Sequence, residues 1–168
     1  MAKLGQVQEG MTKLRQGITT RQRWGARCYQ TGILGSLGEV QAANGQPEEA
    51  LDSFADALAL VEETGERYYE AELHRLKGEL LLARHEEGTA ETSLHNAIEV
   101  ARRQSARSWE LRATISLARL WQTQGKTDEA HRRLAEVFEW FTEGFDTRDL
   151  REAQALLDKL AQGDEDPD

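Results

Sequence analysis

Four histidines, one cysteine and 30 acidic residues are the side chains of this sequence that could carry out catalysis or bind a metal ion. A His-Glu-x-x-His segment would place two imidazoles on one helix face, and a Cys-x-x-Cys pair would offer two thiolates to zinc. The sequence contains neither arrangement. The segment His85-Glu86-Glu87 falls in an expected turn, where a solvated loop is the better interpretation. We expect no metal ion and no cofactor, the histidines being His74, His85, His95 and His131.

Carboxylate pairs are a second route to catalysis. Glu70 with Glu72, and Glu86 with Glu87, are candidate pairs. General acid–base catalysis needs a pocket that moves two such pKa values apart, and no segment predicts one. Cys28 lies in an expected helix, which favours a buried structural thiol over an activated nucleophile. We therefore expect a protein that is not an enzyme.

Three glycines at a spacing of three residues, Gly32, Gly35 and Gly38, invite comparison with a phosphate-binding loop. The Gly-Lys-Ser/Thr ending of such a loop is missing, and no strand precedes the segment. Within a helix, the same spacing creates a smooth face against which another helix packs closely. We favour the packing interpretation.

The large aromatic side chains have two interpretations, a ligand-binding box or core packing. Core packing is favoured, because Trp109 shares a repeat position with two tyrosines. We expect Trp140 and Phe141 to attach the last helix to the rest of the protein. The residues considered are Trp24, Trp109, Trp121, Trp140 and Phe141.

Composition limits the class of protein. The chain of 168 residues has 30 acidic and 21 basic residues and a net charge of −9, which disfavours binding to a phosphate backbone. No apolar stretch approaches the roughly 18–20 residues that cross a bilayer, and no signal peptide is visible. We expect a cytoplasmic protein that binds neither nucleic acid nor membrane.

Self-similarity at an interval of 40 residues is the most informative pattern. Six series of like residues keep the same register, which predicts a solenoid of repeated units. The series are Ala50/Ala90/Ala130, Phe54/Leu94/Leu134, Leu58/Ile98/Phe138, Tyr29/Tyr69/Trp109, Gly38/Gly78/Ala118 and Val40/Leu80/Leu120.

Each unit has the pattern of a helical hairpin. In the first full unit a small residue lies in one helix, a glycine breaks the chain, and an apolar stripe follows in the next helix. These positions, which resemble the tetratricopeptide signature, are Gly38, Gly45, Ala50, Phe54 and Ala57. The interval of 40 residues is longer than the usual tetratricopeptide period of about 34 and close to that of HEAT repeats, but the alanine–phenylalanine spacing favours the former.

We therefore predict an all-α fold, a tetratricopeptide-like right-handed superhelix of antiparallel helix hairpins with a C-terminal capping helix. One domain is expected over residues 1–161, with a half repeat at 3–19, repeats at about 24–64, 65–104 and 105–144, and a cap at 147–161; residues 162–168 form an acidic tail that we expect to be disordered. The expected helices span residues 3–17, 24–43, 47–63, 67–84, 88–104, 107–124, 127–142 and 147–161.

The first helix has no partner helix in its own unit, because the chain begins within a repeat. An uncovered solenoid end exposes apolar surface. Two interpretations remain open: the polar first helix acts as a modest cap, or this end pairs with a second copy to form a homodimer.

Three segments are similar to the C-terminal helical region of large bacterial proteins that carry a cyclase or DNA-binding domain followed by a STAND-type ATPase: GERYYEAELHRLKGELLL (65–82), ARSWELRATISLARLWQTQGK (106–126) and EWFTEGFDTRDLREAQALLDKL (139–160). The resemblance covers about residues 20–161 and implies a region that senses or docks a ligand or protein during signal transduction. No cyclase or ATPase motif is carried by this chain. The three glycines of residues 32–38 depart from the more alanine-rich helix of such proteins.

In such a superhelix the first helix of each hairpin lines the concave face. The candidate groove residues are Glu72, Arg75, Glu79, Arg112, Arg119 and Gln122, with Gly35, Glu39 and Ala42 in the first unit. The three arginines either clamp an acidic peptide or form salt bridges with Glu72, Glu79 and Glu110.

The functional prediction is a non-catalytic protein–protein interaction or scaffold module whose partner is a protein or peptide, an acidic one if the arginines are free. The alternative is a sensor domain that binds a small metabolite in the concave groove.

Overall fold

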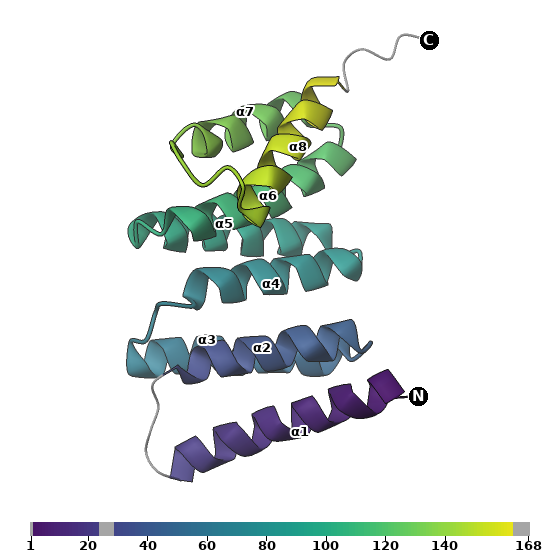
Figure 1. Cartoon of the computed structure of the whole chain (residues 1–168), viewed down its shortest axis with the longest axis vertical. Coiled ribbons are helices and arrows are strands. Elements are labelled where there is room, and N and C mark those ends of the chain that lie inside the picture. The colour runs from purple at the N-terminus through teal and green to yellow at the C-terminus, as the bar shows by residue number, and fades with distance from the viewer. Residues whose placement is uncertain (1, 24–28, 163–168) are drawn as a thin grey trace.

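The protein folds into a stack of α-helices, seen in a computed structural model that describes residues 2–23 and 29–162 and the side chains of 9–20, 23 and 29–162 (Figure 1). Over this part of the chain the regular structure is entirely helical. None of the described helices is both long and apolar enough to cross a membrane. The elements are α1 (Ala2–Arg23), α2 (Gln30–Ala43), α3 (Pro47–Thr64), α4 (Glu70–Ala83), α5 (Glu87–Arg103), α6 (Arg107–Thr123), α7 (Thr127–Phe138) and α8 (Arg148–Gln162).

Three hairpins, α2/α3, α4/α5 and α6/α7, follow one another along the stack. We call the first helix of each hairpin its A helix (α2, α4, α6) and the second its B helix (α3, α5, α7). Each A helix packs on its own B helix and on the next A helix, and each B helix packs on the A helix that follows it. The α8 helix packs on α6 and α7, so it takes the place of a fourth A helix and ends the stack. This arrangement confirms the predicted superhelical repeat fold.

Small residues on the A helices allow the hairpins to close. A Cβ atom added to Gly78 would lie 2.8 Å from Cγ of Leu94, and one added to Gly38 would overlap the ring of Phe54. Phe54 and Leu94 are themselves almost completely buried. The close-packing interpretation of Gly32, Gly35 and Gly38 is thus confirmed: Gly38 makes room for the B-helix residue Phe54, whereas Gly32 and Gly35 make room for Tyr68 and Tyr69 at the start of the next unit.

Neighbouring units are also joined by side-chain hydrogen bonds that recur at a sequence separation of 37 residues. Oγ of Ser116 donates to Glu79 at 2.8 Å, and the side-chain amide of Gln124 donates to Glu87 at 3.1 Å. The ammonium of Lys159 donates to Gln122 at 3.4 Å, so α8 continues the series. These bonds add to the apolar contacts that hold successive units together.

Some predicted bounds were wrong. The α1 helix continues to Arg23 instead of ending at 17, and α7 ends at Phe138 instead of 142. The chain turns after Phe138 because the ring of Phe141 packs into the C-terminal core, and a left-handed Gly144 then redirects it into α8. The predictions for Cys28, Trp24 and the tail 163–168 lie outside the described residues.

The outer face of α1 supports the interpretation of a polar cap. Met11 and Ile18 are buried against Leu37 of α2. The described side chains of α1 that are exposed are all polar or charged, being Glu9, Thr12, Lys13, Arg15, Gln16, Thr19, Thr20 and Arg23. A homodimer through this end stays a prediction.

The turn inside each hairpin places one residue in the left-handed backbone region. Gly45 and Gly125 have φ values of 74° and 73°, and His85 holds the same place with φ 62°. A left-handed conformation brings Cβ of an ordinary residue close to its own carbonyl oxygen, and glycine avoids this.

We predict that His85→Gly stabilises the protein by about 1 kcal/mol, because in the described part of the chain the exposed imidazole makes no hydrogen bond or ion pair that offsets the backbone cost. Urea unfolding followed by circular dichroism measures the change. Gly125→Ala, the reverse substitution in the equivalent turn, is expected to destabilise by a similar amount. A His85→Gly protein no more stable than the parent would contradict the prediction.

Candidate functional site

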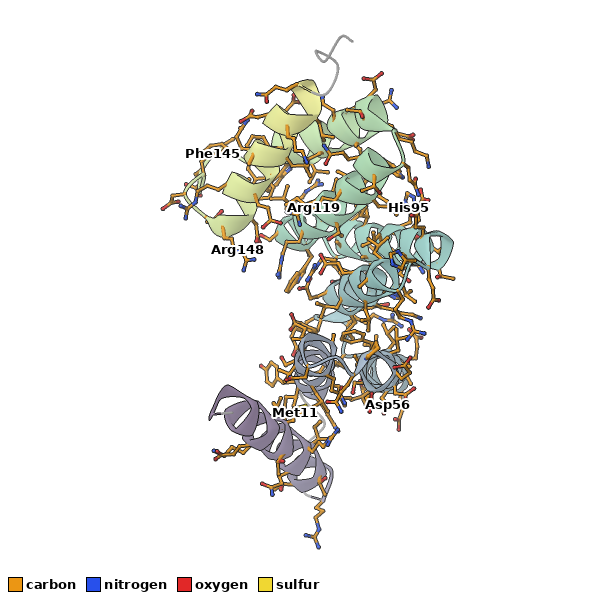
Figure 2. All side chains as sticks on the ribbon, turned by 90° about the vertical axis from the view of Figure 1, so that its right-hand side faces the viewer. Met11, Asp56, His95, Arg119, Phe145 and Arg148 are labelled. Atoms are coloured by element: carbon orange, nitrogen blue, oxygen red, sulfur yellow. The ribbon has the colours of Figure 1, made fainter. Side chains whose placement is uncertain are left out.

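The concave side of the stack carries a groove formed by the A helices and α8. It contains a cavity of about 340 Å³ whose walls come from α2, α4, α6 and α8. Figure 2 shows Arg119 and Arg148 on the concave side, with Asp56 of α3 on the opposite side. The cavity draws on every A helix, and its walls are mainly charged.

The six predicted groove residues do not share one environment. Arg75, Glu79, Arg112 and Arg119 line the cavity. Glu72 lies beneath it and is only 2% exposed. Gln122 does not line the cavity and instead accepts a hydrogen bond from Lys159 of α8.

A buried ion cluster forms the floor of the groove. Arg75 donates to Glu72 through Nε at 2.7 Å and through Nη2 at 2.8 Å. Nη1 of Arg112 approaches the same carboxylate at 3.0 Å, which links α4 to α6. Burial alone would lower the pKa of Arg75, but the hydrogen bonds and charges of Glu72 and Glu79 raise it. The guanidinium of Arg75 is therefore held charged and fully engaged within the protein.

The remaining cavity arginines also meet carboxylates of this chain. Nε of Arg112 lies 3.6 Å from Asp149, and Nη2 of Arg119 lies 2.8 Å from Glu152. The salt-bridge interpretation therefore holds for Glu72 and Glu79, whereas Glu110 was wrongly included. Glu110 is buried at the start of α6 and is bound there by Arg102 and Arg107.

The sequence analysis missed the wall supplied by α8, which consists of Arg148, Asp149 and Glu152. This helix was treated only as a cap. The repeat register held the missing signal, because one further step of 40 residues from Arg112 reaches Glu152. Glu152 lies in the groove wall because α8 occupies the place of an A helix, so its inner side faces the groove.

Glu39 of α2 differs from the other acidic residues of the groove. In the described part of the chain it makes no ion pair, and its side chain is exposed to the groove. Partial desolvation by the groove walls raises the pKa of Glu39, the neighbouring charge of Glu72 raises it further, and Arg75 acts in the opposite direction. Glu39 is thus a carboxylate placed among like charges without a dedicated partner.

A row of aromatic rings runs along one edge of the stack, from the start of α2 to the start of α6. Tyr29 packs edge-on against Tyr68 with ring centroids 5.7 Å apart, and Tyr69 packs edge-on against Trp109 at the same distance. Tyr68 and Tyr69 connect the two pairs at 5.8 Å. The predicted core role fits Trp109, which packs on a core cluster, whereas its register partner Tyr29 is 65% exposed.

Burial, followed by the charges of Glu39 and Glu72, raises the pKa of Tyr69 to about 12. Its hydroxyl is therefore a neutral hydrogen-bonding group next to the acidic end of the groove. A Cβ on Gly35 would lie 2.6 Å from the Tyr69 ring, so the glycine makes room for this ring.

The tryptophans do not form one box in the described residues. Trp121 is buried and its indole donates to Glu91 at 2.7 Å. Trp140 is 56% exposed beneath the guanidinium of Arg107, whereas Phe141 packs into the terminal core. The attachment of α8 is therefore made by Phe141 and not by Trp140. Among the described residues no group of histidine, cysteine and acidic side chains is arranged to hold a metal ion.

Solved structures of repeat proteins are similar to this chain. BtubC (BKLC) from P. vanneervenii superimposes with a TM-score of 0.75 at 16% identity, over 99% of this chain and 78% of that one. TPR-like repeats of the kinesin light chain type from Podosopora anserina give 0.70 at 20% identity, over 96% and 81%. A point variant of the latter gives 0.72 at 20% identity, over 96% and 80%.

The chain has a TPR-like helical repeat fold. At these identities the similarity concerns the fold alone. No protein-family model matches the sequence, and no curated protein sequence matches it.

We predict that Arg75 and Arg119 contribute very differently to stability. Arg75→Met leaves the buried Glu72 with one cation fewer and is expected to destabilise by about 3–5 kcal/mol. Arg119→Met removes a half-exposed ion pair and is expected to cost less than about 1 kcal/mol. Urea unfolding of both variants measures the difference, and equal losses would show that the floor cluster has no special structural role.

We also predict a pH-dependent effect at Glu39. Its pKa is raised from the ordinary value of 4.5 in the folded protein, so the folded state binds this proton more tightly than the unfolded chain does. The stabilisation by that proton is complete below the ordinary value and is lost as the pH rises through the raised one. Glu39→Gln is therefore expected to increase the melting temperature by about 1–2 °C at neutral pH and to leave it unchanged near about pH 4.

Thermal unfolding at the two pH values tests this prediction. Asp56→Asn on the opposite side is the control, and its effect is expected to be the same at both. A Glu39→Gln effect on the melting temperature that does not change with pH would contradict a raised pKa of Glu39 in the folded protein.

Proposed function

We propose that this protein is an interaction module that holds an extended segment of a partner protein in its concave groove. The observation that carries the proposal is the continuous polar groove on α2, α4, α6 and α8, with exposed aromatic rings along one edge. An extended peptide needs hydrogen-bonding partners for its backbone and flat apolar surfaces for its side chains. The groove and the aromatic row supply both.

The end of the groove near α8 is suited to an acidic side chain. The side chains of Arg119 and Arg148 are 51% and 90% exposed, and each forms an ion pair with Glu152. A guanidinium has five N–H donors, so most of those on Arg119 and Arg148 stay available to a second carboxylate. Arg75 is not available to bind an acidic side chain of a partner, because its guanidinium already forms ion pairs with Glu72 and Glu79.

The setting that we propose is signal transduction. Three segments resemble the helical region that follows a STAND-type ATPase in bacterial signalling proteins, where such a region senses or docks another molecule. An interaction groove is compatible with that position, and the context is tested by the genomic sequence surrounding the coding region.

A small polar metabolite is the second candidate ligand. The cavity volume of about 340 Å³ lies within the range of small-molecule sites, roughly 300–1,000 Å³. Such sites are mostly apolar and enclose their ligand, whereas this cavity is charged. A thermal shift with a charged metabolite, lost in Arg119→Glu, would favour the sensor over the peptide module.

The peptide proposal is tested by selecting binders from a displayed library of random peptides. The affinity of each binder is then measured by fluorescence anisotropy for the parent protein and for Arg119→Glu/Arg148→Glu. We expect a loss of about tenfold or more in the double variant. Arg132→Glu is the matched control, because Arg132 is an exposed arginine on the B helix α7. Binders that are insensitive to the double variant would place the binding site elsewhere, and the absence of any binder would overturn the proposal.

A further inference from the structure

A second hollow adjoins the acidic end of the groove. It lies between α2 and α4, has a volume of about 330 Å³, and shares Glu39, Leu76 and Glu79 with the groove cavity. We call it the α2/α4 crevice. Apart from the two glutamates, its lining is apolar and consists of Ala42, Ala43, Phe54, Leu76, Leu80 and Ala83.

Small side chains keep this crevice open. Ala42 of α2 stands one repeat before Leu82 of α4, and Leu82 packs into the next core cluster. Ala43 and Ala83, also one repeat apart, are both exposed. The first unit therefore has a gap where the second unit has a leucine.

The two carboxylates at the crevice have unused acceptor capacity. Glu39 has no ion pair in the described part of the chain. Glu79 receives Nη1 of Arg75 at 2.5 Å and Oγ of Ser116 at 2.8 Å, both on Oε1, and in the described part of the chain its Oε2 accepts no hydrogen bond. The same register position is glutamate at 39 and 79 and arginine at 119, so the charge of the groove changes sign along the stack.

We propose that the α2/α4 crevice receives a lysine or arginine side chain of the partner segment. The aliphatic stem lies on the apolar floor, and the cationic head is placed between Glu39 and Glu79. This inference rests on the proposed function of the groove and adds a specificity: a basic residue at the α2/α4 end and an acidic residue at the α8 end.

The chemistry of the crevice selects this occupant over others. A purely apolar side chain would desolvate Glu39 and Glu79 further and offer them no hydrogen bond, which carries an energetic cost. A Mg²⁺ or Ca²⁺ ion needs about six or more oxygen ligands, and the apolar floor supplies none. Lysine and arginine combine a long apolar stem with a charged end, and they commonly cover apolar surface in this way.

The crevice is tested with n-butylammonium, which reproduces the stem and head of lysine. Titration into ¹⁵N-labelled full-length protein, followed by two-dimensional NMR, is expected to shift the amide signals of Ala42, Ala43, Leu80 and Ala83 in a saturable manner. The probes n-butanol and ammonium chloride, at matched ionic strength, lack the charge and the stem respectively. Both are expected to bind at least several-fold more weakly. Equal binding of n-butanol would overturn the proposal.

Two variants and a control assign the effect to the crevice. Glu39→Gln is expected to weaken n-butylammonium by about fivefold. Ala83→Leu, which fills the hollow and keeps both carboxylates, is expected to abolish saturable binding. Asp56→Asn removes a negative charge on the opposite side and is expected to have no effect. Equal weakening by Glu39→Gln and Asp56→Asn would mean that only net charge matters, and it would refute the crevice site.

Selected peptides separate this inference from the function on which it rests. Binders that depend on Arg119 and Arg148 but show no enrichment of lysine or arginine, and no loss in Glu39→Gln, would refute the crevice and leave the groove in place. Binders enriched in a basic residue, with affinity reduced in Glu39→Gln, support both. A library that yields no binder sensitive to any groove variant refutes the interaction function itself.

Discussion

The close approach of the two helices in each hairpin is the constraint on which the rest of the structure depends. A glycine or alanine on the A helix, at positions 38, 78 and 118, faces a large B-helix residue at 54, 94 or 134. The large residue fills the space that the missing side chain leaves, so each hairpin closes in one way. Since every unit has the same internal geometry, the units stack with a constant offset, and the inner surfaces of α2, α4, α6 and α8 align into one groove.

That alignment has an electrostatic consequence. Charged residues at equivalent positions of successive units are brought next to one another, and alternating charge lets them neutralise each other. Arg112 reaches Glu72 of the preceding A helix and Asp149 of the following one. The buried part of this network holds the A helices together, whereas its exposed ends, Arg119 and Arg148 near α8 and Glu39 near α2, stay accessible. Burial, and not residue type, therefore decides which of these charged residues are engaged within the protein and which stay accessible.

The proposed interaction surface presents different charged groups at its two ends. Glu39 and Glu79 lie at the α2/α4 crevice, the exposed arginines Arg119 and Arg148 lie at the α8 end beside their partner Glu152, and an aromatic row borders the edge where the A helices begin. Under the proposed function, exposed carboxylates at one end and exposed guanidiniums at the other would give a bound segment a preferred direction, because the reversed segment would meet like charges. Such a surface favours specificity more than affinity, since each exposed ion pair contributes little by itself.

The sequence alone determined the helices, the repeat register and the small-against-large pairs, because these depend on local periodicity and on residues whose size directly limits packing. It also identified four residues that line the groove cavity, Arg75, Glu79, Arg112 and Arg119. Only the tertiary structure decided that Arg75 forms an ion pair with the buried Glu72 and that α8 forms a wall of the groove. It also decided that the small Ala42 lines an open crevice, whereas Leu82, one repeat later, packs into the core. The pairing of a charged side chain depends on which of several nearby partners its rotamer reaches across 37 to 40 residues of chain. The register alone does not encode that choice.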